Sequence, residues 1–234
     1  MITRPIYGII GGMGPSSSAE FVHYIYSQCA GKFPSERYFP RIVLVSDSLA
    51  PDRYLSFKND NFDVLGKYIE TTIKNLNFMG VDKIMICCLV AHACLKTMDN
   101  HLVKNVVKMT DLIEENIKNL NENVVLLSTS MFYQLKLIKH EGIIYIKEIE
   151  EVNTFISKLK VSERQEDFID FIKFMEKILF KYQANNVVFA CSDLHLCNQF
   201  IKKNKIPITF NIIDAIDLAA SYILADKQES PYVV

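Results

Sequence analysis

Two cysteines in this 234-residue chain share one local pattern: an apolar run, the cysteine, three residues and then a histidine. Cys88 is followed in this way by His92, and Cys191 by His195. A cysteine thiolate is a reactive base, and a thiol at a helix N-terminus has its pKa lowered from about 8.5 towards neutrality. Two thiols on opposite faces of one carbon suit stereoinversion, since one removes a proton and the other returns one. The pattern predicts proton transfer by Cys88 and Cys191.

Two other interpretations fit the same residues. Free cysteine is among the most buried residue types, so a thiol ending an apolar strand can be a core residue. We assign this role to the four remaining cysteines, Cys29, Cys87, Cys94 and Cys197. The second alternative is zinc, because Cys88 with His92 and Cys191 with His195 would supply a tetrahedral Cys₂His₂ set. Structural zinc ligands usually lie closer together in sequence and on loops, so we favour thiol chemistry and assign no metal ligands.

Short apolar strands alternating with helices would position both cysteines. In the first half we expect strands at 6–10, 42–45 and 83–88, and helices at 19–29 and 61–78, with Ser16 to Ser18 offering N-caps to the first helix. The second half repeats this plan, with strands at 123–127, 143–146 and 187–191, helices at 129–140 and 162–182, and a final helix from Asp214. Such alternation predicts mostly parallel sheets with helices on their faces. Ligands bind at the carboxyl ends of such strands, where both cysteines would stand.

The repeated plan predicts an α/β protein of two pseudo-symmetric domains, each a mostly parallel sheet flanked by helices, with the active site in the cleft between them. We expect the first domain at 1–105 plus 212–234 and the second at 106–211. No Pro/Gly/Ser-rich linker separates the two halves, so a close-packed hinge is expected at the boundary. The two thiols would meet only if the halves close over a common cleft.

Composition narrows the range of partners. The chain has 26 Lys and Arg against 27 Asp and Glu, so no net charge attracts it to nucleic acid or anionic lipid. No apolar run approaches the roughly 20 residues that span a bilayer. Six cysteines in a chain this long do not resemble the disulfide framework of a small secreted domain. We therefore expect a cytoplasmic protein that binds a small molecule rather than nucleic acid or a membrane.

Four motifs, taken in order, resemble the cofactor-independent aspartate/glutamate racemase family. They are Gly11-Gly12-Met13-Gly14-Pro15, Pro51-Asp52-Arg53, Gly80-Val81-Asp82 leading to Cys88 and His92, and Cys191-Ser192-Asp193. The resemblance spans nearly the whole chain. It implies an isomerase without pyridoxal phosphate or metal, in which two cysteines act as acid and base at Cα of a free amino acid such as aspartate or glutamate. It also implies a homodimer.

The resemblance also assigns roles to individual residues. Cys88 and Cys191 match the catalytic pair, and Arg53 matches an arginine that holds a side-chain carboxylate bidentately. The other residues that match substrate-binding positions are Met13, Gly14, Leu89, Val90, Thr129, Lys160 and Ser192. Residues that could orient the thiols are His92, Asp193 and His195.

The chain departs from the family where the substrate carboxylate would bind. Leu89 and Val90 stand where the family usually has Asn-Thr, whose side chains bind the α-carboxylate. The apolar pair leaves open a second reading, a superfamily member with a less polar substrate, such as a decarboxylase, a maleate-isomerase-like or a hydantoin-racemase-like enzyme. A third reading is a non-catalytic relative that binds amino acids.

Overall fold

The computed structural model describes residues 4–58, 62–161 and 164–225. The chain divides into two compact units. The first unit comprises the described parts of Met1–Met109 and Ala219–Val234, and the second is Thr110–Leu218. The chain thus passes between the units after Met109 and again after Leu218, whereas the sequence placed these passages after residues 105 and 211.

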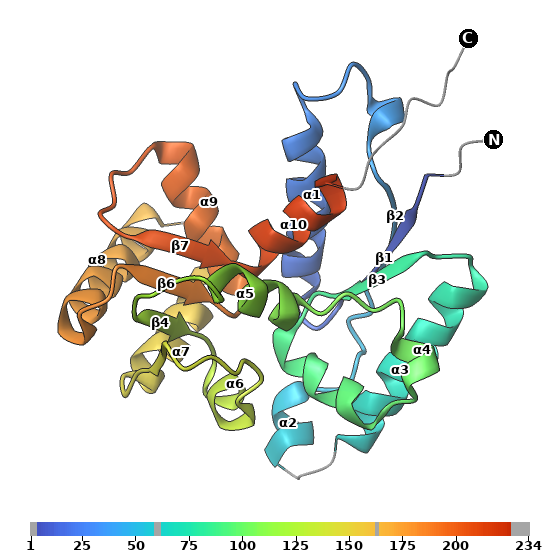
Figure 1. The fold of residues 1–234 in the computed structure, drawn as a ribbon, viewed down its shortest axis with the longest axis horizontal. Coiled ribbons are helices and arrows are strands. Elements are labelled where there is room, and N and C mark those ends of the chain that lie inside the picture. The colour runs from blue at the N-terminus through green and yellow to red at the C-terminus, as the bar shows by residue number, and fades with distance from the viewer. Residues whose placement is uncertain (1–3, 59–61, 162–163, 226–234) are drawn as a thin grey trace. The chain divides into compact units, whose positions relative to one another are not determined.

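The first unit is built on a three-stranded sheet of order β2–β1–β3, with all strands parallel (Figure 1). Its strands are β1 (Ile6–Ile10), β2 (Arg41–Val45) and β3 (Lys83–Ile86). Ile10 is in register with both Val45 and Ile86, so the carboxyl ends of the three strands lie level at one edge. This confirms the parallel sheet that the sequence predicted.

Helices connect the strands of the first unit. They are α1 (Pro15–Cys29), η1 (Glu36–Tyr38), α2 (Arg53–Lys58), α3 (Asp63–Phe78), η2 (Leu89–Thr97) and α4 (Asn100–Val103). Helix α1 begins at Pro15 after Gly14, and no side chain caps it, so the predicted serine N-cap is wrong. Proline at the first helical position has its φ already set for a helix. The Ser18 hydroxyl lies inside the helix and donates to the Pro15 carbonyl at 2.9 Å.

The second unit has a four-stranded parallel sheet of order β5–β4–β6–β7 (Figure 1). The strands are β4 (Val124–Leu127), β5 (Ile143–Tyr145), β6 (Asn186–Phe189) and β7 (Asn211–Asp214). Every residue of β4 and β6 is buried, as expected for strands covered on both faces. The sequence interpretation missed β7, but the final helix that it expected from Asp214 is present as α10 (Ala215–Ala225), which begins one residue later.

The second unit also contains most of the remaining helices. These are α5 (Met109–Ile117), α6 (Ser130–Leu135), α7 (Ile149–Leu159), α8 (Gln165–Tyr182), η3 (Ser192–Leu194), α9 (His195–Asn204) and α10 (Ala215–Ala225). Helix α6 is shorter than predicted, because Lys136 adopts the left-handed conformation that ends it. Helix α10 begins in the second unit and ends in the first.

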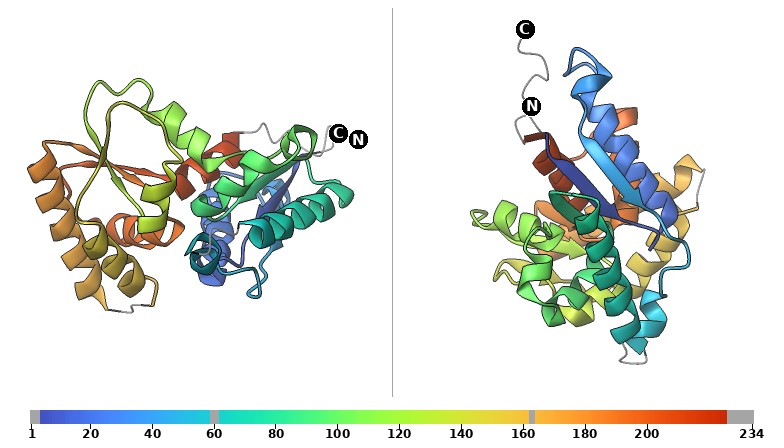
Figure 2. Two further views of the ribbon diagram at one scale, coloured as in Figure 1. Left: turned by 90° about the horizontal axis from the view of Figure 1, so that it is seen from below. Right: turned by 90° about the vertical axis from the view of Figure 1, so that its right-hand side faces the viewer.

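Aromatic contacts hold α7, α8 and α9 in one layer, in which α7 and α8 lie side by side (Figure 2). Phe171 of α8 packs on Phe155 of α7 and on Phe189 of β6, with ring centroids 5.2 and 6.2 Å apart. Phe168 of α8 stacks on Phe200 of α9 at 4.7 Å. The layer therefore fixes α9, the helix that follows Cys191, against the sheet. Among the helices of the described residues, none has the length and apolar character that a bilayer crossing requires.

Candidate active site

Cys88 stands at the carboxyl end of the first unit's sheet. Strand β3 ends two residues earlier at Ile86, and Cys88 has extended backbone as the N-cap of η2. Its carbonyl accepts the N–H of Ala91 at 3.1 Å, which closes the first helical turn. The residue is 8% exposed. Cys88 thus combines a rigid strand end with a helical turn that starts at the next residue.

Cys191 has the same local structure in the second unit. Strand β6 ends at Phe189, and Cys191 has extended backbone as the N-cap of η3. Its carbonyl accepts the N–H of Leu194, again three residues later and again at 3.1 Å. Its neighbour Ala190 donates its N–H to Leu127 of β4 at 2.9 Å. The two cysteines therefore occupy equivalent positions, one in each unit.

A glycine-rich turn follows β1, the strand beside β3. Gly12 has φ +82°, and a Cβ there would lie 2.1 Å from the Asp47 carbonyl oxygen, so only glycine fits this close approach. The turn ends at Gly14, with Met13 buried between the two glycines. The Cys87 N–H donates to the Ile10 carbonyl at 2.8 Å. Because β1 and β3 are neighbours, the turn and Cys88 share one edge of the sheet.

Arg53 begins α2, in the connection that follows β2. The Asp52 carboxylate accepts the Leu55 N–H at 2.7 Å and so fixes the start of this helix. Arg53 is half-buried, and among the described residues no carboxylate forms an ion pair with it.

Both ring nitrogens of His92 bond to the main chain. Nδ1 lies 3.1 Å from the Cys88 carbonyl oxygen and 3.2 Å from that of Leu89, and Nε2 lies 3.2 Å from the Met109 nitrogen. The Met109 N–H can only donate, so Nε2 accepts and Nδ1 carries the proton. The ring is 4% exposed. His92 thus fixes the backbone around Cys88 to the last residue before the chain leaves the first unit.

His195 also uses both ring nitrogens, but with side chains. Nδ1 lies 2.7 Å from Oδ2 of Asp214, and Nε2 lies 2.9 Å from the amide nitrogen of Gln199. The Gln199 amide nitrogen can only donate, so Nδ1 carries the proton and directs it at Asp214. In both Cys-x₃-His motifs the Nε2 lone pair, which a zinc ion would need, already accepts a hydrogen bond from the protein. The Cys₂His₂ interpretation therefore lacks its two imidazole ligands.

Ligand-type atoms of His195, Asp214 and Asp217 lie within 4.8 Å of one another. Donors of the protein already bind one oxygen of Asp217 in this cluster: Oδ2 accepts the Asn198 amide at 2.9 Å and forms an ion pair with Lys202. The Lys202 ammonium group, which is itself a cation, is bound to the Asp217 carboxylate. The cluster is therefore a hydrogen-bond network rather than a metal centre.

Thr129 lies at the same sheet edge as Cys191. It follows the end of β4, and the adjacent Ser128 hydroxyl donates to the Ala190 carbonyl at 2.6 Å. The Thr129 hydroxyl oxygen is buried and makes no hydrogen bond with any described residue. A buried hydroxyl left unsatisfied costs about 1–3 kcal/mol. This hydroxyl is therefore suited to a bound ligand.

The remaining predicted site residues fall into three groups. Leu89 and Val90 are buried in the first turn of η2, so they present no polar side chain beside Cys88. Ser192 and Asp193 form the first turn after Cys191 and are half-buried. Lys160 is the C-cap of α7, and its side chain is exposed.

Three other thiols have raised pKa values. Burial, followed by the nearby charge of Cys88, raises the pKa of Cys94 to about 11. Burial, followed by Asp214, raises the pKa of Cys197 to about 12. Burial likewise raises the pKa of Cys29. These thiols stay protonated near neutral pH, as befits the core role that the sequence suggested.

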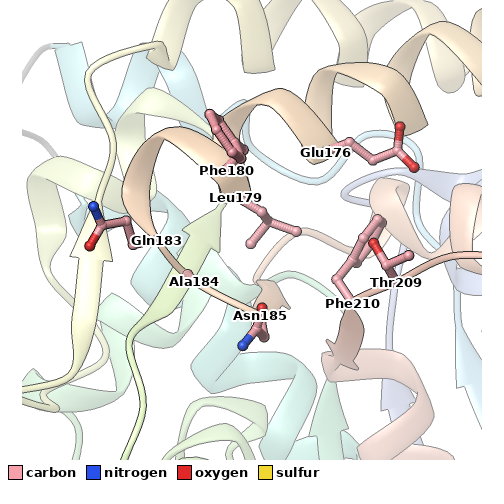
Figure 3. Close-up of a pocket in the computed structure, with 8 residues that line it drawn as sticks. All are labelled: Glu176, Leu179, Phe180, Gln183, Ala184, Asn185, Thr209 and Phe210. Carbon is pink, nitrogen blue, oxygen red and sulfur yellow. The ribbon is translucent and has the colours of Figure 1, made fainter.

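A separate groove of about 520 Å³ lies at the opposite, amino-terminal edge of the second sheet. Its lining comes from the end of α8, the turn that follows and the segment before β7 (Figure 3): Glu176, Leu179, Phe180, Gln183, Ala184, Asn185, Thr209 and Phe210. None of the predicted site residues lines it. The groove lies at the amino ends of the strands, whereas Cys191 follows the carboxyl end of β6, so the two are at opposite edges of the sheet.

Sequence reasoning missed two residues that the structure places around the cysteine turns. These are Asp214, which binds His195, and Met109, which binds His92. Asp214 lies 19 residues from its partner in sequence. The one local signal is that Asp214 ends a short apolar run, 211–214, at the edge where ligand-binding residues gather.

Together, the two parallel α/β units with a cysteine at equivalent strand ends define the fold class of the pseudo-symmetric racemases. The family model described as Asp/Glu/Hydantoin racemase matches residues 10–223. The chain therefore belongs to the Asp/Glu/hydantoin racemase family, and it is an enzyme of the isomerase class. This confirms the family that the four sequence motifs indicated.

Individual relatives agree with this assignment over most of the chain. A broad-specificity amino-acid racemase of Bacillus subtilis (strain 168) is 24% identical over 214 residues, which cover 86% of this chain and 90% of the relative. The structure of Picrophilus torridus aspartate racemase matches with a TM-score of 0.73 and 24% identity, covering 94% of this chain and 93% of that one. An aspartate racemase homologue from Pyrococcus horikoshii OT3 matches with a TM-score of 0.70 and 18% identity, over 95% and 98% of the two chains.

Proposed function

We propose that this enzyme racemises a free amino acid without a cofactor, with Cys88 and Cys191 as its two proton-transfer residues. The observation that supports this most strongly is the equivalence of the two cysteines. Each is the N-cap of the helical turn after a parallel strand, and each carbonyl accepts the amide N–H three residues later. A two-base inversion needs one such residue for each face of the substrate.

The proposed chemistry is a proton exchange at Cα. The thiolate of one cysteine takes the Cα proton, so that an S–H bond forms while the C–H bond breaks. The electron pair moves into the substrate carboxylate as a planar carbanion. The thiol of the other cysteine then protonates the opposite face and becomes the thiolate for a reaction in the reverse sense.

Three groups would hold the substrate. Arg53 has no ion pair among the described residues, and its planar guanidinium matches a side-chain carboxylate, which favours aspartate or glutamate. Thr129 offers a buried hydroxyl that lacks a partner within the described chain. Because Leu89 and Val90 cannot donate from their side chains, backbone N–H groups at the start of η2 and in the turn ending at Gly14 would bind the α-carboxylate.

A second candidate is an enzyme of the same superfamily that acts on a less polar substrate. The observation in its favour is the buried apolar pair Leu89 and Val90 directly after Cys88. The broad specificity named for the Bacillus subtilis relative is compatible with this choice. A substrate panel separates the two candidates, because turnover of acidic amino acids alone would exclude the less polar substrate.

The deciding experiment is α-proton exchange. The purified protein is incubated in D₂O with each L- and D-amino acid, and the Cα–H signal is followed by NMR. We expect exchange with inversion, and we expect its loss in Cys88→Ser and in Cys191→Ser. Cys29→Ser is the matched control, because this buried thiol only donates to the Ile25 carbonyl of its own helix at 3.2 Å. Full racemisation by either of the first two variants would rule out the two-cysteine mechanism.

We also propose that the enzyme is a homodimer in the cytoplasm. All six cysteines lie within the described residues and are not paired in disulfides, which is compatible with a reducing compartment. Sedimentation equilibrium of the full chain tests the dimer, and a molar mass equal to the 26.9 kDa chain would contradict it.

A further inference from the structure

One face of α9 carries a polar network that reaches the start of α10. His195, Asn198 and Lys202 recur at helical spacing along this face. His195 Nδ1 and Asn198 Nδ2 lie 2.7 and 2.8 Å from the same oxygen of Asp214. Asn198 also donates to Asp217 at 2.9 Å, and Lys202 pairs with Asp217. The network therefore joins the helix after Cys191 to the end of β7 and the first turn of α10.

Asp214 is the centre of this network. Its side chain is 0% exposed, and its second oxygen accepts the Ile216 N–H at 2.9 Å, which caps the start of α10. A buried carboxylate is tolerated only when several donors surround it. The imidazole, the Asn198 amide and the Ile216 N–H supply them. Each of these donors belongs to α9 or α10, so the carboxylate links the two helices.

The network also lies close to Cys191 along the chain. Asp214 is in register with Phe189 on the neighbouring strand, two residues before Cys191. His195 follows Cys191 by one helical turn. The Cys191 turn is thus held on one side by the β6–β7 ladder and on the other by the imidazole. Helix α10 continues from this point through Leu218 to the residues of the first unit.

We propose that Asp214 is a positioning residue. Acting through His195 and Asn198, it fixes the turn that begins at Cys191 to the first turn of α10. The orientation of the Cys191 thiol therefore depends on the His195–Asp214 hydrogen bond, although neither residue is the proton-transfer group. The kinetic part of this inference rests on the proposed racemase function, whereas the reactivity of the thiol does not.

The test compares two variants of His195. In His195→Asn the side-chain amide can replace the Nδ1 donor, whereas His195→Leu removes it. His101→Leu is the matched control, because His101 is exposed on α4 of the first unit. The readouts are kcat and KM for amino-acid racemisation, and the rate at which iodoacetamide alkylates Cys191, measured by peptide mass spectrometry. Circular dichroism confirms that each variant is folded.

We expect His195→Leu to lower kcat by about 10- to 100-fold with KM little changed, because a thiol displaced by about 1 Å acts on the transition state more than on binding. Cys191 should be alkylated several-fold faster in this variant, since its turn is no longer held. His195→Asn should restore both readouts towards the wild-type values, and His101→Leu should change neither.

Wild-type values of kcat and alkylation in a folded His195→Leu protein would overturn the proposal and leave the network a packing role only. If the wild-type enzyme racemises no amino acid, the racemase proposal fails and the alkylation rates alone decide the positioning role. If His195→Leu does not fold, Asn198→Leu decides, because it removes the amide that donates to Asp214 and leaves the imidazole in place. An unchanged alkylation rate in a folded Asn198→Leu protein would then overturn the proposal.

Discussion

The main-chain N–H of Met109 donates to Nε2 of His92 at 3.2 Å, and the same imidazole binds the carbonyls of Cys88 and Leu89 through Nδ1. One side chain thus connects the catalytic candidate to the residue at which the chain leaves the first unit. The second unit uses His195 and Asp214 in a comparable place. Each motif histidine thus forms hydrogen bonds with groups that lie next to its cysteine turn.

Replacing His92 by leucine should destabilise the fold, because the buried Met109 N–H loses its hydrogen-bond partner, whereas the Cys88 carbonyl still accepts the Ala91 N–H. Each lost hydrogen bond that leaves a buried group unsatisfied costs about 1–3 kcal/mol. Urea denaturation should show a lower midpoint than for the wild type, whereas His23→Leu, at an exposed position on α1, should unfold as the wild type does. Equal midpoints for His92→Leu and the wild type would contradict this expectation.

Gly12→Ala should be much more destabilising than Gly80→Ala. Both glycines have positive φ, +82° and +74°, but a Cβ at Gly12 meets the Asp47 backbone at 2.1 Å, whereas a Cβ at Gly80 meets nothing within 4 Å. The conformational penalty of about 1–2 kcal/mol is common to both. The difference between the melting temperatures of the two variants measures the steric contribution at Gly12. Similar melting temperatures would show that the turn can move to accommodate the added Cβ.

Thr129→Val should lower kcat/KM without lowering stability. The hydroxyl makes no hydrogen bond within the described chain, so its loss removes nothing from the fold. A hydrogen bond to a charged substrate is worth about 1.5–3 kcal/mol, or roughly 10- to 150-fold in kcat/KM. Thr129→Ser keeps the hydroxyl and should retain most activity. An unaffected kcat/KM in Thr129→Val would place the substrate elsewhere.

Iodoacetamide should discriminate among the thiols at pH 8. Cys191 is half-buried and should be alkylated in the native protein, whereas Cys94 and Cys197, with pKa raised to about 11 and about 12, should not. The thiolate is the reactive species, so labelling of Cys94 should rise only as the pH approaches 11. Peptide mass spectrometry of briefly treated protein provides the comparison, and equal labelling of Cys94 and Cys191 at pH 8 would contradict it.

The Glu148 carboxylate should make stability depend on acid pH. Burial raises its pKa, but hydrogen bonds from Lys181 and Tyr182 outweigh this effect, and the pKa is lowered overall. A lowered folded-state pKa stabilises the protein above the unfolded-state pKa, and this stabilisation is lost as the pH falls through the folded-state value. Glu148→Gln should therefore lower the melting temperature at pH 7 but not at pH 3. The exposed Glu176→Gln is the control, and a constant difference across this range would refute the linkage.

The fold class, the family and the location of both cysteines at strand ends could be predicted from the amino-acid sequence. These features depend on local patterns: apolar runs of strand length, helical periodicity between them, and a cysteine directly after two of the runs. The N-terminal motif also indicated the glycine turn. It could not show that α1 begins at Pro15 without a side-chain cap, because a serine run has several possible caps.

The hydrogen-bond partners of the two motif histidines could not be predicted from the sequence. An imidazole four residues after a cysteine can bind the thiol, a metal or the surrounding chain, and sequence spacing does not distinguish these partners. In the folded chain His92 bonds to Met109 and His195 bonds to Asp214, which lie 17 and 19 residues away in sequence. Strand β7, which presents Asp214, is four residues long and has too weak a pattern to identify. Such contacts depend on strand register and helix packing, which form only when the chain as a whole buries its core.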